Sequence, residues 1–98
     1  MAQNFAVMSY GPRAGTAVSV SAASTSAQDL GAGTTRVVIS STTLCHIIFG
    51  DSSVAAAQST DYPLQPNTDY VFDIAPFCRY FRVIRDSASG TLTWAVVQ

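Results

Sequence analysis

Neither lysine nor glutamate occurs in this chain of 98 residues, whose charge is carried by five arginines and six aspartates. Lysine and glutamate favour helices, whereas the Val, Ile, Thr, Tyr and Phe that the chain retains favour strands. Protein interfaces are also depleted of lysine and glutamate and keep arginine and aromatic residues, because guanidinium is weakly hydrated and bonds in a planar fork. The composition therefore predicts an all-β domain with much of its surface covered by partners.

Length and net charge narrow the classes of protein further. Ninety-eight residues fit one domain, and a charged share of 11% is too low for a disordered chain. The net charge of −1 provides no long-range field that would attract nucleic acid or acidic lipids. No apolar run approaches the ~18 residues of a membrane span. The first residues lack the pattern of a signal peptide, so we expect synthesis in the cytoplasm.

Short runs with the two-residue alternation of strands recur from residue 16 onward, separated by turn signals. The six runs expected to form strands are 16–22, 35–41, 44–49, 69–74, 79–85 and 91–97. The second and third flank a Ser-Thr-Thr turn and are predicted to pair as a hairpin. Residues 54–58 favour a short edge strand, with one helical turn at 55–58 as the alternative. Residues 62–67 favour a connection because of their prolines. This spacing predicts a small antiparallel β-sandwich or jelly-roll with an extended N-terminal arm.

Residues 1–14 are expected to form that N-terminal arm, and residues 15–98 the β-sandwich domain. Glycine and proline at the end of the arm break regular structure. The arm's apolar residues, which so short a segment cannot bury by itself, are Phe5, Val7, Met8 and Tyr10. They need either the domain's own surface or a neighbouring molecule, and the sequence leaves both possibilities open.

The pair Cys45-His46 places a nucleophile beside a base. Neighbours on a strand point to opposite faces, so these side chains cannot meet, and we expect Cys45 in the core. A disulfide between Cys45 and Cys78 stays open, although cytoplasmic assembly favours free thiols. One histidine and two cysteines do not complete a zinc site. We therefore predict no catalytic residues, no metal and no cofactor.

The remaining charges suggest structural roles. Most aspartates fall in turns, where the side chain caps its own backbone. Asp69 and Asp73 lie on one strand face at a separation of about 13 Å, which is too far for a shared metal or a glycosidase pair. The basic cluster Arg79, Arg82 and Arg85 is expected to pair with these two aspartates on an adjacent strand, or with a neighbouring subunit. Its cations do not gather on one face, which disfavours direct nucleic-acid binding.

The aromatic residues divide into two groups. Those that alternate inward on predicted strands and are expected in the core are Phe49, Phe72, Phe81 and Trp94. Three others, Tyr62, Phe77 and Tyr80, are less easily placed inside and are candidate interface anchors. The predicted partner interface comprises Phe5, Val7, Met8, Tyr10, Arg13, Tyr62, Phe77, Tyr80 and Arg82.

Several pieces follow one another between residues 35 and 98. They are Cys45-His46-Ile47-Ile48-Phe49-Gly50, an Ala/Ser-rich stretch, Ser59-Thr60-Asp61-Tyr62-Pro63-Leu64, a Pro-Asn turn, an aromatic strand, Val83-Ile84-Arg85-Asp86, and Ser-Ala-Ser-Gly90-Thr91-Leu92-Thr93. This order, over about two-thirds of the chain, resembles small virion proteins of tailed bacteriophages. The resemblance implies a β-sandwich structural protein of the phage particle, such as a head decoration (cement) protein. The first 34 residues lie outside it.

The resulting expectation is a non-enzymatic virion component that is assembled in the host cytoplasm and stabilises the capsid lattice. Its expected partners are the major capsid protein and copies of itself, without direct nucleic acid or membrane, and exposed sheet edges would bind neighbours. Within the particle, a head–tail adaptor, coat or fibre subunit is the alternative. A cell-surface carbohydrate- or protein-binding β-module is the rival of another class. An enzyme comes last, because no nucleophile–base–orienter set can be assembled.

Overall fold

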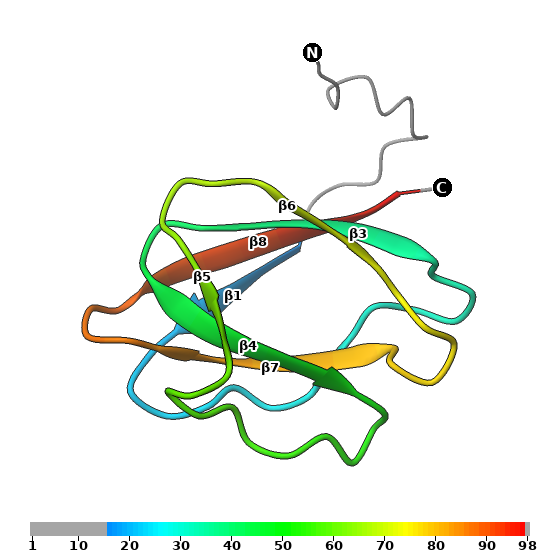
Figure 1. Ribbon diagram of the computed structural model, residues 1–98, viewed down its shortest axis with the longest axis horizontal. Coiled ribbons are helices and arrows are strands. Elements are labelled where there is room, and N and C mark those ends of the chain that lie inside the picture. The colour runs from blue at the N-terminus through cyan, green and yellow to red at the C-terminus, as the bar shows by residue number, and fades with distance from the viewer. Residues whose placement is uncertain (1–15, 98) are drawn as a thin grey trace.

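The computed structural model describes residues 16–97, which form two four-stranded antiparallel sheets and no helix. The strands are β1 (Thr16–Val20), β2 (Gln28–Asp29), β3 (Arg36–Ser41), β4 (Cys45–Gly50), β5 (Tyr62–Leu64), β6 (Tyr70–Asp73), β7 (Tyr80–Arg85) and β8 (Gly90–Val97). Sheet A has the order β1-β8-β3-β6, and sheet B the order β2-β7-β4-β5 (Figure 1). The all-β, sandwich-like prediction is thereby confirmed, whereas the arm predicted at residues 1–14 lies outside the described residues.

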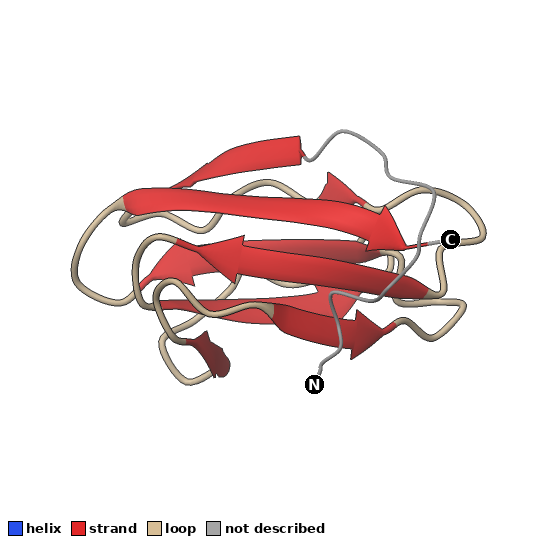
Figure 2. Cartoon of the chain, turned by 90° about the horizontal axis from the view of Figure 1, so that it is seen from above, coloured by secondary structure: helices blue, strands red, loops and turns tan. Residues whose placement is uncertain are grey.

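The two sheets lie one above the other (Figure 2). The core lies between them, because each long strand turns its alternate apolar residues to the same side. Its fully buried members are Val20, Val37, Ile39, Cys45, Ile47, Leu64, Phe81, Val83 and Leu92. Phe81 of sheet B meets Trp94 of sheet A edge to face, with ring centroids 5.0 Å apart. Phe49 and Phe72, which were also expected in the core, are partly buried and pack against its margin.

Among the described strands, only β4 and β5 follow each other within one sheet. The turn at residues 42–44 carries the chain from β3 in sheet A to β4 in sheet B, so the predicted hairpin is wrong. β3 and β4 each have apolar residues at alternate positions. Because the two strands lie in facing sheets, the apolar residues of both are buried against each other. Ser41 supports this corner, because its hydroxyl donates to the carbonyl of Thr43 (2.8 Å) and accepts from the amide of the same residue (3.2 Å).

The two shortest strands lie at the margins of sheet B. β5 occupies an edge, where a proline is tolerated, so the prediction of a simple connection at 62–67 is wrong for its first three residues. β2 lies within a Ser/Ala/Gly-rich stretch and pairs through two residues with β7. Residues 54–58 form neither the predicted strand nor a helical turn. Val54 and Ala57 are nonetheless buried, and their side chains fix this irregular loop to the rest of the domain.

Candidate functional site

His46 lies on the side of β4 that faces away from Cys45, and it is buried. Its Nδ1 is 3.0 Å from the carbonyl oxygen of Asp61, and its Nε2 is 2.9 Å from Oδ1 of Asp86. Both partners accept hydrogen bonds, so both ring nitrogens donate when the ring is an imidazolium. The hydrogen bond to Asp86 raises the pKa of His46, and burial opposes this effect. We call this arrangement the His46 clamp, since it ties β4 to two segments remote in sequence.

The position of Cys45 confirms the prediction that it lies in the core. Cys45 is fully buried in the core and Cys78 is partly buried, and both are free thiols. Burial raises the pKa of the Cys45 thiol, so it is held in its unreactive protonated form. The side chains of Cys45 and His46 extend to opposite faces of β4, and this pair does not form a nucleophile–base couple.

Two ion pairs join neighbouring segments of the same sheet: one connects β2 to the residue that precedes β7, and the other connects β3 to β6. Arg79 holds Asp29 through two hydrogen bonds of 2.6 and 2.8 Å, which lower the pKa of Asp29 to about 2 and raise that of Arg79. Arg36 donates to Asp73 over 2.9 Å, between β3 and β6. The prediction that the cluster around Arg79 pairs with Asp69 or Asp73 is therefore wrong. The physical reason is that β6 belongs to sheet A and β7 to sheet B.

The other two described arginines also bond to their own chain. Arg82 donates from Nε to the carbonyl of Thr25 (2.7 Å) and from Nη1 to that of Val54 (3.2 Å). Arg85 donates from Nη1 to the hydroxyl of Ser89 (2.9 Å). Each arginine within residues 16–97 thus has an oxygen partner in the same chain. This surface accordingly presents little unpaired positive charge.

The predicted interface residues differ in exposure. Tyr62 is 57% exposed and Phe77 is 73% exposed, which is the accessibility that an interface anchor needs. Tyr80 is partly buried, with the guanidinium of Arg79 5.4 Å from its ring centroid. The guanidinium of Arg82 donates to two carbonyl oxygens of its own chain, as described above. Five further predicted residues, Phe5, Val7, Met8, Tyr10 and Arg13, lie outside the described residues.

Tyr62 belongs to an aromatic group that closes the side of the sandwich where β5 and β6 face each other. Its ring centroid lies 6.3 Å from that of Tyr70 and 6.1 Å from that of Phe72, both on β6. Tyr70 and Phe72 are stacked, and Phe49 of β4 continues the group at 5.1 Å from Phe72. We call these four residues the aromatic group. The alternation of the sequence indicated the members of this group one by one. It did not indicate that β5 and β6, edge strands of different sheets, bring Tyr62 beside Tyr70 and Phe72.

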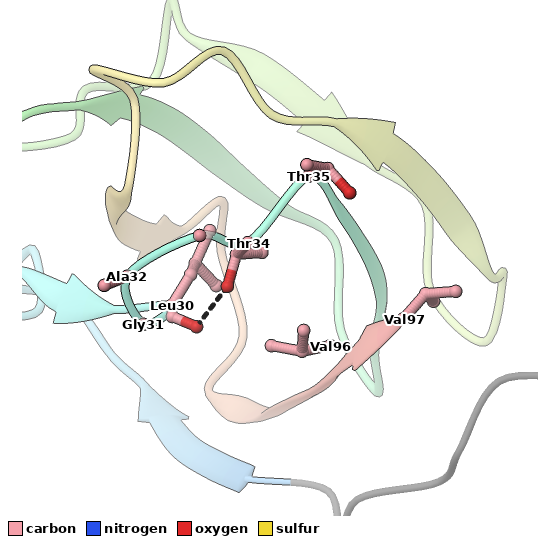
Figure 3. A pocket seen from close by; sticks show the side chains of 8 residues that line it. Leu30, Gly31, Ala32, Thr34, Thr35, Val96 and Val97 are labelled. Carbon is pink, nitrogen blue, oxygen red and sulfur yellow. Dashed lines mark hydrogen bonds between the residues drawn. The ribbon is translucent and has the colours of Figure 1, made fainter.

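Among residues 16–97, the opposite side of the sandwich, next to β1 and β2, has two hollows. One hollow of about 340 Å³ is lined by Thr16, Asp29, Leu30, Gly31, Trp94, Ala95 and Val96. A second of about 370 Å³ adjoins it and is lined by residues 30–35 with Val96 and Val97 (Figure 3). The loop around it is shaped by Gly31, whose φ is 99°, and by a hydrogen bond from the Thr34 hydroxyl to the carbonyl of Leu30 (2.8 Å). Sequence reasoning missed both hollows, because small residues and backbone supply most of their lining.

Comparison with known proteins identifies no relative of this chain, so the functional inference rests on the geometry described above. No protein-family model, curated protein or solved structure matches this chain. Within residues 16–97, no group of three or more His, Cys, Asp or Glu residues is arranged to hold a metal ion. The same residues include no helix long and apolar enough to cross a membrane.

Proposed function

We propose that this chain is a non-enzymatic structural subunit of a phage particle, which decorates the capsid lattice and stabilises it. The observation that carries the proposal is the strand order, β1-β8-β3-β6 in one sheet and β2-β7-β4-β5 in the other. Eight strands in two such sheets, with the chain crossing repeatedly between them, fit a jelly roll. Jelly rolls recur in viral capsid and lectin domains. This argument rests on an analogy between folds, and a fold does not by itself determine function. The function therefore has to be argued from the residues on the surface.

The described surface is suited to docking against protein. Removing an unpaired charge from water is costly, and the described arginines already bond within the chain. On the outer face of sheet A, Val38 lies opposite both Val71 of β6 and Ala95 of β8. Val71 is one of the exposed large apolar residues, together with Tyr62 and Phe77. A partner that covers Val38 and Ala95 would also meet the carboxylate of Asp69, which lies beside them, and would have to supply a hydrogen-bond donor for it.

The mechanism would rest on repetition. A domain of this size offers each neighbour a small contact, whose affinity is modest by itself. On a symmetric lattice, every copy repeats the same contact, and linked contacts raise the effective concentration of each one. Copies that bridge adjacent capsid subunits would then resist expansion or loss of those subunits.

The first test is rate-zonal sedimentation of a lysate from the cells in which the chain is naturally made, with the chain followed by mass spectrometry. Co-migration with large particles at high copy number is the expected result. Migration as a free species of one to a few 10.3 kDa chains would overturn the proposal. Electron cryomicroscopy of the particles then separates positions: copies spread over the head indicate decoration, whereas a ring at one vertex indicates an adaptor.

A variant pair tests the exposed aromatic anchors. Tyr62→Ser and Phe77→Ser should reduce particle occupancy, because hot-spot aromatics often contribute more than about 2 kcal/mol to an interface. Ala17→Ser, at an exposed position of β1, serves as the matched control and should bind as the parent does. Unchanged occupancy in both aromatic variants would exclude these residues from the interface.

A carbohydrate-binding module is the second candidate, and the aromatic group favours it. An exposed Tyr62 beside Tyr70 and Phe72 offers ring faces on which a sugar can stack. This candidate predicts glycan-array binding by the isolated chain that Tyr62→Ser abolishes. Sedimentation with particles and an absence of glycan binding would favour the first proposal.

A further inference from the structure

The His46 clamp joins three segments on the outer side of sheet B. His46 lies opposite Ile84 of β7 and Pro63 of β5, so its side chain stands between the two neighbours of β4. One hydrogen-bond partner, Asp86, directly follows β7, and the other, Asp61, directly precedes β5. The clamp therefore holds the edge strand β5 through a side-chain contact, in addition to the backbone pairing of that strand with β4.

Both hydrogen bonds can form at the same time only while each ring nitrogen carries a proton. Asp86 offers a carboxylate oxygen and Asp61 a carbonyl oxygen, and at neutral pH neither group has a hydrogen to donate. A neutral imidazole has one N–H and one lone pair, so one lone pair would then point at an oxygen 2.9 or 3.0 Å away. The side chain of His46 is only 10% exposed, which leaves water little room to bridge these atoms. Loss of the proton therefore breaks one half of the clamp.

The contact with the carbonyl of Asp61 is the half expected to break. A hydrogen bond to an ionised carboxylate is roughly twice as strong as one between neutral groups. The neutral ring should therefore keep its proton on Nε2, toward Asp86, and turn the lone pair of Nδ1 toward Asp61. The two partners are also held differently by their own backbones. The amide of Asp86 donates to the carbonyl of Leu44 (3.0 Å), whereas Asp61 leads into a strand of three residues at the edge of sheet B.

The charged groups around the ring favour its protonated form. The hydrogen bond to Asp86 raises the pKa of His46 most, burial opposes it, and the backbone contact and negative charge of Asp61 raise it further. Arg82 lies on the same face of β7, two residues before the one opposite His46, and its guanidinium donates to two backbone carbonyls. From β5 the facing residue is Pro63, which has no ionisable group. The ring therefore stays protonated until the pH passes its ordinary value.

We propose that loss of one proton from His46 opens the clamp and releases residues 58–62 from β4, while the rest of both sheets stays paired. These residues move together, because Asp61 closes its own turn. Its Oδ2 accepts from the amide of Gln58 (2.7 Å), and its amide donates to the carbonyl of the same residue (2.9 Å). The proposal concerns the free chain and does not depend on a role in a phage particle.

The opening would change the side of the sandwich that carries the aromatic group. Tyr62 directly follows Asp61, and its ring centroid lies 6.3 Å from that of Tyr70 and 6.1 Å from that of Phe72, both in the other sheet. Leu64 is fully buried, so it stays in place as the pivot of the movement. A single proton would thus decide whether the ring of Tyr62 is held against sheet A.

The test is NMR spectroscopy of the full-length chain between about pH 6 and about pH 9. His46 is the single histidine, so its ring nitrogens report their own titration and tautomer. We expect the Nε2–H tautomer above the midpoint, and a nuclear Overhauser effect between Tyr62 and Tyr70 that weakens over the same titration. Amide exchange is divided by the intrinsic rate at each pH. At Gln58 and Asp61 it should accelerate at least about tenfold more than in β3 and β8, which report global unfolding.

Two variants separate the clamp from a general effect of pH. Asp86→Asn removes the carboxylate that holds the proton, so the ring titration and the opening should move together to lower pH. Ser89→Ala is the matched control, because it removes only a hydroxyl that accepts from Arg85 (2.9 Å) in the same turn. Its midpoint should equal that of the parent. Trp94 fluorescence reports whether each variant is folded.

Three results would overturn the proposal. Exchange at Gln58 and Asp61 that stays parallel to exchange in β3 and β8, with an unchanged contact between Tyr62 and Tyr70, would mean that the ring titrates without any opening. An Nδ1–H tautomer above the midpoint would mean that the contact with Asp86 breaks instead. An opening at the same pH in Asp86→Asn and in the parent would assign the transition to another group.

Discussion

The His46 clamp should make the free energy of unfolding depend on pH in the neutral to alkaline range. The hydrogen bond to Asp86 raises the pKa of His46 in the folded chain above the ~6.5 of an unfolded one. Between these two values the folded chain holds a proton that the unfolded chain has released. The clamp's contribution is therefore complete below about pH 6.5 and is lost as pH rises through the folded-state pKa, with a slope of at most about 1.36 kcal/mol per pH unit.

The size of the effect follows from the contacts. A hydrogen bond to a charged group contributes about 1.5–3 kcal/mol. The Asp86 side chain is 41% exposed, so water weakens the pair, and we expect a total near 1–1.5 kcal/mol. Urea unfolding followed by fluorescence of Trp94, the single tryptophan, measures this quantity from about pH 6 to about pH 9 in the presence of a reducing agent.

Two variants separate the clamp from other titrating groups. Asp86→Asn keeps a hydrogen-bonding side chain but removes the negative charge, so most of the slope should disappear. Asp51→Asn is the matched control, because Asp51 accepts from the amide of Ser53 in a turn and contacts no histidine. Stability that is flat or rises with pH in the parent would refute the reasoning, as would an unchanged slope in Asp86→Asn.

Three further outcomes are expected. Phe81→Ala should lower the free energy of unfolding by about 3–5 kcal/mol in urea titrations, because its ring is fully buried between the sheets; a loss below about 1 kcal/mol would contradict this. Gly90→Ala should cost about 1–3 kcal/mol, read as a lower Tm, since the added Cβ would lie 2.5 Å from the Thr42 hydroxyl oxygen; an unchanged Tm would show that the turn adapts freely. The ion pair between Asp29 and Arg79 contributes above about pH 4 and is lost as pH falls through about 2, so Asp29→Asn should flatten acid unfolding between these values, and an acid limb like that of the parent would argue against the pair.

Alternation along the chain was sufficient to predict the six longer strands and which residues face the core. Phe81, for example, was expected in the core, and it is fully buried. The pattern was not sufficient to assign strands to sheets. The two-residue period gives the orientation of a side chain but carries no information about the partner strand, which is why residues 35–41 and 44–49 were mistaken for a hairpin.

The candidate site was predicted less completely. The exposure of Tyr62 and Phe77 agrees with their predicted role as anchors, although that role stays a prediction. The His46 clamp could not be foreseen, because its partners Asp61 and Asp86 lie 15 and 40 residues away. The pairing of Arg79 with Asp29 was missed because β2 is too short to show any alternation.

The position of β8 between β1 and β3 governs the order in which the domain can fold. During synthesis, β1 is made some 70 residues before its partner and must wait for it, exposing apolar residues in the interval. Sheet B repeats this delay, because β2 and β4 both pair with the later β7. Such remote pairings require large loops to close, and the conformational entropy of each loop is lost before its contacts stabilise the chain. Folding is slow for this reason. We therefore expect sheet A to be completed only after β8 has left the ribosome.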